Sequence, residues 1–249
     1  MESVYRACEV VARSMVRVQG LRFTMTGLQH IPSAGGAVLA MNHTAYTEPL
    51  YAGLAARRAK RWLRFMTKIE VFQHPLGGFV ARHARQIPVE RSQGAQSYDL
   101  AVQALRDGEL VGVYPEATIS RSFELKTFKR GAARMALEAQ VPLVPMIIWG
   151  AQRVWTKGQP RRLGRTSTPI TVAVGEPIMP SGTADELTWL LFERMNDLLH
   201  AVQEGYGPHP SGAAWVPQRL GGGAPSLAEA NRMDAADLEA RRARRGPDL

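Results

Sequence analysis

The sequence predicts a single α/β domain with a central mixed, largely parallel sheet flanked by helices. After Gly20, apolar runs typical of strands alternate with stretches of helical periodicity. At 249 residues, with 45% hydrophobic and 21% charged residues, the chain has the length and composition of an ordinary globular domain. The runs expected to form strands are 36–41, 87–89, 110–114, 141–149 and 170–174. The stretches expected to form helices are 49–60, 75–84, 95–106, 131–139 and 184–204.

Two further segments flank this domain, which we place at residues 21–205. Residues 1–20 predict an amphipathic helix that either packs on its own domain or lies in a membrane interface. Its apolar positions recur at helical spacing, at Val4, Cys8, Val11, Met15 and Val18. Residues 206–249 are rich in Gly, Pro and Ala, which predicts a flexible tail. Ser226 and Glu229 form a possible capping box for a short polar helix within it.

The net charge indicates which kinds of molecule the protein can bind, and the cysteine content indicates its cellular compartment. The net charge is +9 and the sequence pI is near 10.2, so the protein attracts polyanions such as nucleic acid, anionic lipid or phosphorylated substrates. We expect no nucleic-acid partner, because no basic-aromatic motif or known binding module is present. A single cysteine, Cys8, excludes an intramolecular disulfide framework and fits a reducing, cytoplasmic compartment. The sequence has no signal peptide and no apolar run long enough to cross a membrane.

The segment from His43 to Glu48 says most about the chemistry. It follows the apolar run 36–41 directly. On a continuous helix the two side chains would point roughly 140° apart, so a turn must bring them together. Pro49 favours the first helical position, which predicts Glu48 as the N-cap. A histidine bound to a carboxylate is held in one tautomer, and its free nitrogen can take a proton from an alcohol.

Three more blocks follow this motif. They are Arg85 to Arg91, then Val113 to Ser120 with Phe128 to Ala132 close behind, and the proline-bracketed run Val141 to Pro145. In this order and at this spacing, the four blocks resemble the motifs of the glycerolipid acyltransferases. The resemblance is to the 1-acylglycerol-3-phosphate acyltransferase (lysophosphatidate acyltransferase) family, of actinobacterial type, and covers roughly residues 20–180.

The resemblance implies a fold, a reaction and a set of site residues. It implies the glycerolipid acyltransferase fold, with His43 as the catalytic base and Glu48 in the position of the family's aspartate. It implies transfer of a fatty acyl group from acyl-CoA or acyl-carrier protein to lysophosphatidate, giving phosphatidate at the cytoplasmic face of the membrane. Neither a metal nor a cofactor is expected. The residues expected to bind substrate are Asn42, Lys68, Arg91, Glu116, Thr118, Arg121 and Lys129.

The chain departs from the family pattern at two places. Glu48 stands where the family has Asp, and its extra methylene moves the carboxylate about 1.5 Å from the backbone. Such a shift lowers the rate by about a hundredfold unless the loop has adapted to it. The third motif usually reads Glu-Gly-Thr-Arg-Ser, but Ala117 and Ile119 replace its glycine and arginine. Either Arg121 compensates for the lost charge, or Lys126 and Lys129 carry it. Two alternatives stay open: another lysophospholipid or glycolipid acceptor, and a non-catalytic lipid-binding homologue.

Overall fold

The computed structural model describes residues 2–90 and 94–245, and its centre is a seven-stranded sheet. The strand order is β1-β7-β6-β2-β5-β3-β4. Neighbouring strands are parallel throughout, except for the antiparallel pair β6 and β7. The strands are β1 (Arg22–Thr26), β2 (Ala37–Met41), β3 (Leu63–Lys68), β4 (Ile87–Val89), β5 (Leu110–Val113), β6 (Leu143–Trp149) and β7 (Pro169–Val174).

Helices join and cover these strands. The α-helices are α1 (Glu2–Gln19), α2 (Glu48–Arg58), α3 (Ile69–Gln73), α4 (Pro75–His83), α5 (Gly94–Arg106), α6 (Gly131–Ala139), α7 (Ala184–Gly205) and α8 (Leu227–Arg245). Short 3-10 turns are η1 (Leu28–His30), η3 (Ala151–Arg153) and η4 (Gln218–Leu220). The mixed, largely parallel sheet and its flanking helices confirm the predicted fold class.

The strands missed by the sequence prediction are β1 and β3, and the missed helix is α3. In β1, exposed and half-exposed residues alternate and none is buried, so it lacks the apolar run that marked the other strands. In β3, Arg64 and Lys68 interrupt the apolar pattern. Arg64 is nevertheless buried, because its guanidinium binds both oxygens of Glu109 and the carbonyl of Ala84. A polar pattern can therefore conceal a strand when its charged side chains find partners.

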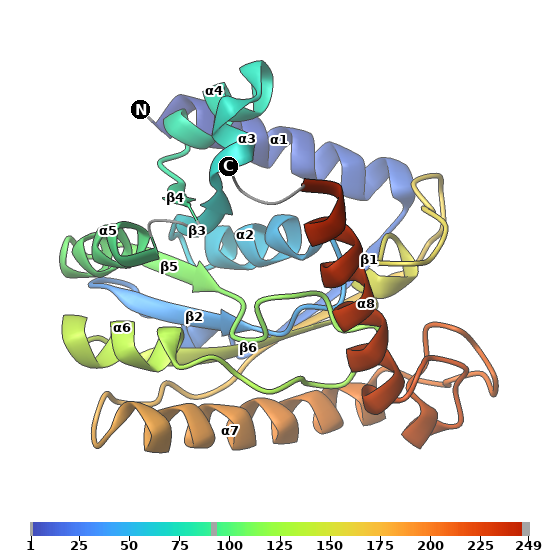
Figure 1. Cartoon of the computed structure of the whole chain (residues 1–249). Helices are drawn as coiled ribbons and strands as arrows, with labels where there is room; N and C mark the ends of the chain where they lie inside the picture. Colours follow the sequence, from blue (N-terminus) through green and yellow to red (C-terminus); the bar gives the residue numbers. More distant parts are fainter. Residues whose placement is uncertain (1, 91–93, 246–249) are drawn as a thin grey trace.

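Helices cover both faces of the sheet, each over its own apolar core (Figure 1). On one face α5, α6 and α7 contribute buried side chains such as Leu105, Met135 and Leu191. On the other face α2 packs Tyr51 and Ala55 against the strands, and α1 lies outside it in contact with α2 and α4. All five residues of β2 are buried between these two layers. The loop that carries His43 therefore starts from a strand that is buried on both faces.

Helix α1 confirms the predicted N-terminal helix. The exposure of its side chains shows which of its apolar residues pack on the domain. Val11, Met15 and Val18 are 58%, 43% and 71% exposed, so this part of the stripe does not pack on the domain, whereas Val4 and Cys8 are half-buried. The side facing the domain instead includes the buried residues Ala12 and Gln19. Among the described residues, no helix is both long and apolar enough to cross a membrane.

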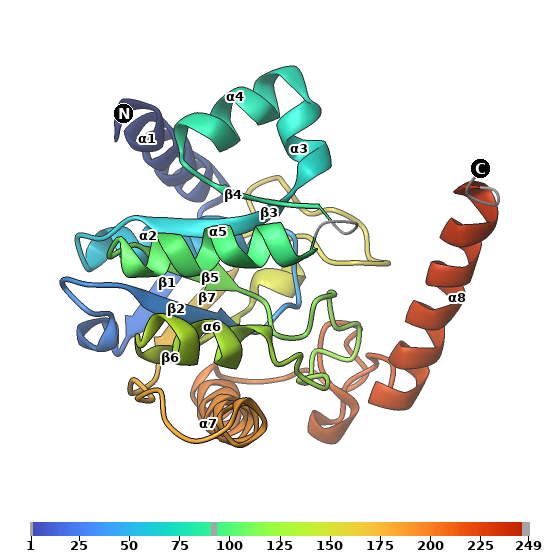
Figure 2. The same cartoon turned by 60° about the vertical axis from the view of Figure 1, so that its left-hand side comes forward.

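The segment after residue 205 follows a defined path that composition did not predict. Ser226 and Glu229 form the expected capping box, and α8 begins at the next residue. The helix is 19 residues long, so it is not the short helix we expected. In Figure 2, α8 lies on the side of the molecule to which β2 points. The flexibility of residues 206–249 and the domain boundaries stay predictions. The contacts of α8 with the domain are described below.

Candidate active site

His43 and Glu48 form the hydrogen-bonded pair that the sequence predicted. His43 Nδ1 lies 2.8 Å from Glu48 Oε2, and the glutamate is fully buried. The turn between β2 and α2 brings the two side chains together. The helix begins at Glu48 and its N-cap is Thr47, one residue earlier than predicted. Pro49 therefore lies inside the first turn, where its missing N–H costs no hydrogen bond.

The loop has adapted to the longer glutamate side chain. Thr44 donates to Glu48 Oε1 twice, from its backbone N–H at 2.7 Å and from its hydroxyl at 2.8 Å. The carboxylate thus receives bonds at both oxygens, which compensate for its burial and fix its orientation. With Oε1 bound to Thr44, the other oxygen is held against His43. The turn therefore accommodates the extra methylene of Glu48, and the carboxylate still reaches His43.

The third motif holds the backbone of His43 from both sides. Glu116 Oε1 accepts from the His43 N–H at 2.7 Å, and the His43 carbonyl accepts from Ser120 N–H at 2.7 Å. Glu116 Oε2 also accepts from the backbone N–H of Lys126 at 3.1 Å. Glu116 is buried and lies outside the cavity lining, and in this structure it holds the backbone of His43. Its predicted contact with substrate stays a prediction.

Tyr114 packs flat against the imidazole. The two ring centroids are 4.1 Å apart and the planes differ by 25°. Burial, with a smaller contribution from the Glu48 charge, raises the pKa of Tyr114 well above its ordinary value, so the phenol stays protonated. Its ring restricts rotation of His43, which the carboxylate already holds at Nδ1.

The missing glycine of the third motif leaves a strained residue. Ala117 has a φ of 60°, in the left-handed region that glycine adopts readily. Its N–H donates to the carbonyl of Tyr114 at 3.0 Å, closing the turn that carries Glu116. The left-handed conformation costs a non-glycine residue roughly 1–2 kcal/mol. The turn is therefore kept despite the substitution.

Glu116 should make stability fall as pH rises. Burial raises its pKa from 4.5 to about 8, although the two backbone N–H donors oppose this shift. Between these values the unfolded state has released the proton and the folded state retains it, so the folded state loses stability with increasing pH. The loss is at most about 1.4 kcal/mol per pH unit and ends above pH 8.

We expect Glu116→Gln to remove this slope from urea-unfolding free energies measured between pH 5 and pH 8. The matched control is Glu124→Gln, which changes a partly exposed carboxyl on the same loop and should retain the wild-type slope. An unchanged slope in Glu116→Gln would show that this carboxyl is already ionised in the folded protein. Because an amide nitrogen cannot accept from a backbone N–H, Glu116→Gln should also lose about 1–3 kcal/mol of stability at pH 5.

His43 lines a large, mostly apolar cavity of about 1400 Å³. This exceeds the roughly 300–1,000 Å³ typical of small-molecule sites. Its walls come from β3, β5, α3, α4 and α6, with apolar contributions from Phe65, Met66, Val80, Ala81, Val113, Ala132 and Met135. Two predicted residues, Lys68 and Lys129, line it as well. The histidine is 20% exposed at its side chain, so a ligand in the cavity can reach it.

The other residues predicted to bind substrate lie elsewhere. Asn42 is fully buried, and its amide exchanges two hydrogen bonds with the backbone of Ile148, tying β2 to β6. In this structure Asn42 thus joins two strands of the sheet, and its predicted contact with substrate stays a prediction. Thr118 accepts a bond from Lys126 Nζ, and Arg121 forms ion pairs with α8. Arg91 lies outside the described residues.

Sequence reasoning missed several residues of this site. Thr44 carried a signal, because a hydroxyl residue one position after the histidine can bind the carboxylate in a tight turn. Tyr114 carried none beyond its place before the Pro115-Glu116 pair. Within the described part of the chain, no group of three or more His, Cys, Asp and Glu residues is arranged to hold a metal ion.

Comparison with known proteins places this geometry in a family. Residues 22–149 match the protein family described as Acyltransferase, and they contain β1 to β6 with the His43–Glu48 pair. The chain belongs to the Acyltransferase family. Within the matched residues of this chain, His43 and Glu48 lie just beyond the end of the central strand β2.

Relatives within the Acyltransferase family carry more specific names. A 1-acyl-sn-glycerol-3-phosphate acyltransferase of Limnanthes douglasii is 30% identical over 201 residues, covering 79% of this chain and 66% of that protein. One from Bacillus subtilis is 25% identical over 179 residues, covering 70% of this chain and 82% of that protein. This chain thus spans about two thirds of the plant relative.

A solved structure supports the fold. The crystal structure of the 1-acyl-sn-glycerophosphate (LPA) acyltransferase PlsC from Thermotoga maritima matches with a TM-score of 0.66 and 18% sequence identity. The match covers 84% of this chain and 86% of that one. At this level of identity the comparison concerns the fold alone.

Proposed function

We propose that this protein transfers a fatty acyl group from a thioester to the free hydroxyl of lysophosphatidate, forming phosphatidate. The observation that carries the proposal is the His43–Glu48 hydrogen bond beside a large, mostly apolar cavity. Family membership and the names of the relatives support the reaction class and the acceptor. The intact pair argues against a non-catalytic lipid-binding homologue.

The proposed mechanism uses His43 as a general base. Glu48 holds Nδ1, so Nε2 is left to take the proton of the acceptor hydroxyl. The acceptor oxygen then forms a bond to the thioester carbonyl carbon, giving a tetrahedral oxyanion. When the carbon–sulfur bond breaks, the thiolate takes the proton from the imidazolium, and the histidine is neutral again. No acyl-enzyme is required, since the acceptor oxygen itself is the nucleophile.

The two substrates divide the site between them. The apolar walls of the cavity suit an acyl chain, and they extend from His43 to α4 and α6. Lys68 and Lys129 lie on the same cavity and supply positive charge for the phosphates of the donor or the acceptor. Acyl-CoA and acyl-carrier protein both remain donors under this proposal.

Transfer of labelled acyl groups tests the proposal directly. Palmitoyl-CoA or oleoyl-CoA and lysophosphatidate in mixed micelles should yield phosphatidate and free CoA in equal amounts. A parallel reaction with acyl-carrier protein compares the donors. Release of CoA without phosphatidate, or transfer only to a different lysophospholipid, would contradict the proposed acceptor.

We further propose that α1 and the α3–α4 pair attach the protein peripherally to the cytoplasmic face of the membrane. Their exposed apolar residues are Val10, Val11, Met15 and Val18 on α1 and Val71, Leu76 and Phe79 on α3 and α4. Helices α1 and α4 are in contact, and Figure 1 shows α1, α3 and α4 together at one end of the molecule. The cavity is lined by residues of the same α3–α4 pair, so a lipid held there has a short path from the bilayer.

Polar substitution on α1 should weaken binding to lipid vesicles. We expect Val11→Asn with Val18→Asn to reduce co-sedimentation with anionic vesicles by at least tenfold, because two apolar side chains are lost from the interface. Trp189→Ser is the control, because Trp189 is 64% exposed but lies on α7, in the layer on the other face of the sheet. Equal loss in both variants would place the membrane contact elsewhere.

A further inference from the structure

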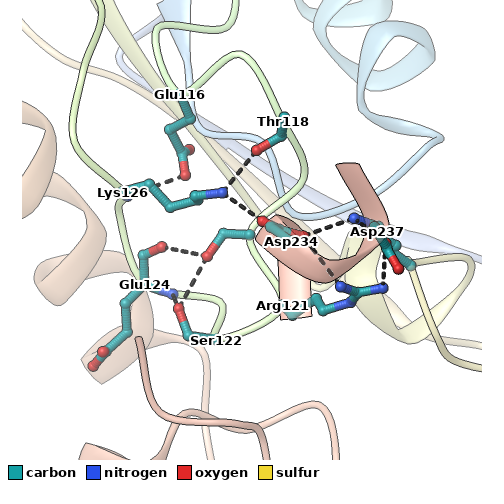
Figure 3. A network of polar contacts seen from close by, with 10 residues as sticks. Glu116, Thr118, Arg121, Ser122, Glu124, Lys126, Asp234 and Asp237 are labelled. Carbon is teal, nitrogen blue, oxygen red and sulfur yellow. Dashed lines mark hydrogen bonds and ion pairs between the residues drawn. The ribbon is translucent and has the colours of Figure 1, made fainter. Parts of the chain in front are cut away.

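Helix α8 contacts the domain through two carboxylates that meet three cations. Lys126 Nζ lies 2.6 Å from Asp234 Oδ2, and Lys157 Nζ lies 2.7 Å from Asp234 Oδ1. Arg121 contributes Nη1 at 3.1 Å from Asp234 and Nη2 at 2.9 Å from Asp237. Figure 3 shows Asp234 between Lys126 and Arg121, with Glu116 on the far side of Lys126.

The cations outnumber the acids that they bind. Three positive side chains, each less than one fifth exposed, surround Asp234, while Asp237 is 40% exposed. Among the described residues, Arg121 Nε is buried without a hydrogen-bond partner. A phosphate monoester carries up to two negative charges and three strongly accepting oxygens in one group, so it can replace both Asp234 and Asp237 among the three cations.

The side of α8 that faces the domain is acidic rather than apolar. Ala230, Asp234 and Asp237 follow one another at spacings of four and three, on one helical face. Ala230 is fully buried, but the larger apolar residues Met233 and Leu238 are 44% and 45% exposed. Little apolar area therefore holds this helix, and its attachment is mainly electrostatic. Salt and competing anions weaken such contacts.

The cation cluster is continuous with the reaction site. Lys126 donates its backbone N–H to Glu116, which in turn accepts from the backbone N–H of His43. Lys126 Nζ also donates to Thr118 at 2.7 Å. Ile119, in the place of the family's arginine, is buried and carries no charge. On this loop, Arg121 and Lys126 bind the acids of α8, whereas Lys129 lines the cavity.

Asp234 is ionised in this contact. Burial alone would raise the pKa of its carboxyl, but hydrogen bonds from Lys126 and Lys157 outweigh burial and leave the pKa below its ordinary value. The carboxylate therefore acts as a resident anion among the three cations.

We infer that Arg121, Lys126 and Lys157 form a binding site for a phosphate monoester, and that α8 closes this site with Asp234 and Asp237 until such a ligand displaces them. The inference rests on the proposed function, since lysophosphatidate carries such a group. Helix α8 is then a built-in competitor of the acceptor, and binding of the phosphate releases the helix from the domain.

Hydrogen exchange of the α8 amides tests release without relying on turnover. In the full chain, lysophosphatidate micelles should raise exchange over residues 227–240 at least several-fold, whereas monoacylglycerol micelles, which lack the phosphate, should not. Glycerol 3-phosphate and inorganic phosphate are separate arms. Release by them as well as by lysophosphatidate identifies the shared phosphate chemistry, and release by lysophosphatidate alone identifies a lipid head group as the source. Equal exchange with lysophosphatidate and monoacylglycerol overturns the inference.

Charge removal gives a second, independent measurement. Asp234→Asn with Asp237→Asn should lower the apparent KM for lysophosphatidate several-fold, while Glu239→Gln, an exposed charge on the same helix, keeps the wild-type value. An unchanged KM in the double variant overturns the inference and leaves the proposed function standing. If no variant turns over lysophosphatidate, the proposed function fails, and the exchange experiment still decides the phosphate site. In the wild type, raising salt from about 0.1 M to about 1 M should release α8 without ligand.

Discussion

Replacing His43 with alanine should reduce the rate of acyl transfer by about 10²–10⁴-fold. In the wild type, Glu48 binds Nδ1 of His43, and the imidazole ring lines the cavity. Without this ring, the cavity has no base at that position to take the proton of the acceptor hydroxyl. The loss should appear in kcat, because His43 takes its proton during the chemical step. Initial rates of phosphatidate formation, measured over a range of lysophosphatidate concentrations, separate kcat from KM.

The control for this variant is His200→Ala, which makes the same change on α7, away from the cavity. It should keep the wild-type rate. Circular dichroism and thermal melting of His43→Ala establish that the fold is intact, since the backbone bonds from Glu116 and Ser120 do not depend on the imidazole. More than a tenth of the wild-type kcat in a folded His43→Ala would exclude His43 as the base.

Glu48→Asp should lower kcat by about a hundredfold, even though aspartate is the residue the family usually carries here. The structure shows why: Glu48 reaches both Thr44 and His43 with its two oxygens at 2.7–2.8 Å. A side chain about 1.5 Å shorter loses at least one of these bonds if the helix still begins at residue 48, with Pro49 in its first turn. The KM for acyl-CoA should change little.

Glu48→Gln distinguishes charge from geometry in the same pair. The amide keeps the length of the side chain but removes the charge that stabilises the imidazolium, so its rate should also fall. If Glu48→Asp equals or exceeds the wild type, the turn is not built around the longer side chain. If Glu48→Gln retains the full rate, the carboxylate does not act through His43.

Several features of the fold and the site were predictable from local patterns. The buried strand β2, the turn at Pro49 and the His43–Glu48 pair all lie within fifteen consecutive residues, where spacing and turn chemistry determine geometry. The capping box of α8 is equally local. By contrast, β1 and β3 lack a continuous apolar run and were not predicted. Their polar side chains are tolerated because they find partners or solvent in the folded protein.

The roles of the third-motif residues were not predictable in the same way. Glu116 was predicted to bind substrate, yet its carboxyl group is buried against the backbone of His43, 73 positions earlier. Asn42 reads as a substrate contact beside the histidine, yet its amide holds β6. The contacts of Glu116 and Asn42 depend on which distant backbone groups need a hydrogen-bond partner. Those groups are brought close only when the sheet has assembled.

The sequence by itself determined the α/β class, the order of most elements and the pairing of His43 with Glu48, because these follow from periodicity and short-range turns. The tertiary structure decided that α1 exposes Val11, Met15 and Val18 and that Glu116 accepts from the backbone N–H of His43. It also decided that the acids of α8 meet Arg121, Lys126 and Lys157. The physical reason is the range of the interactions: burial and ion pairing join residues more than a hundred positions apart, and no local pattern records such a pairing.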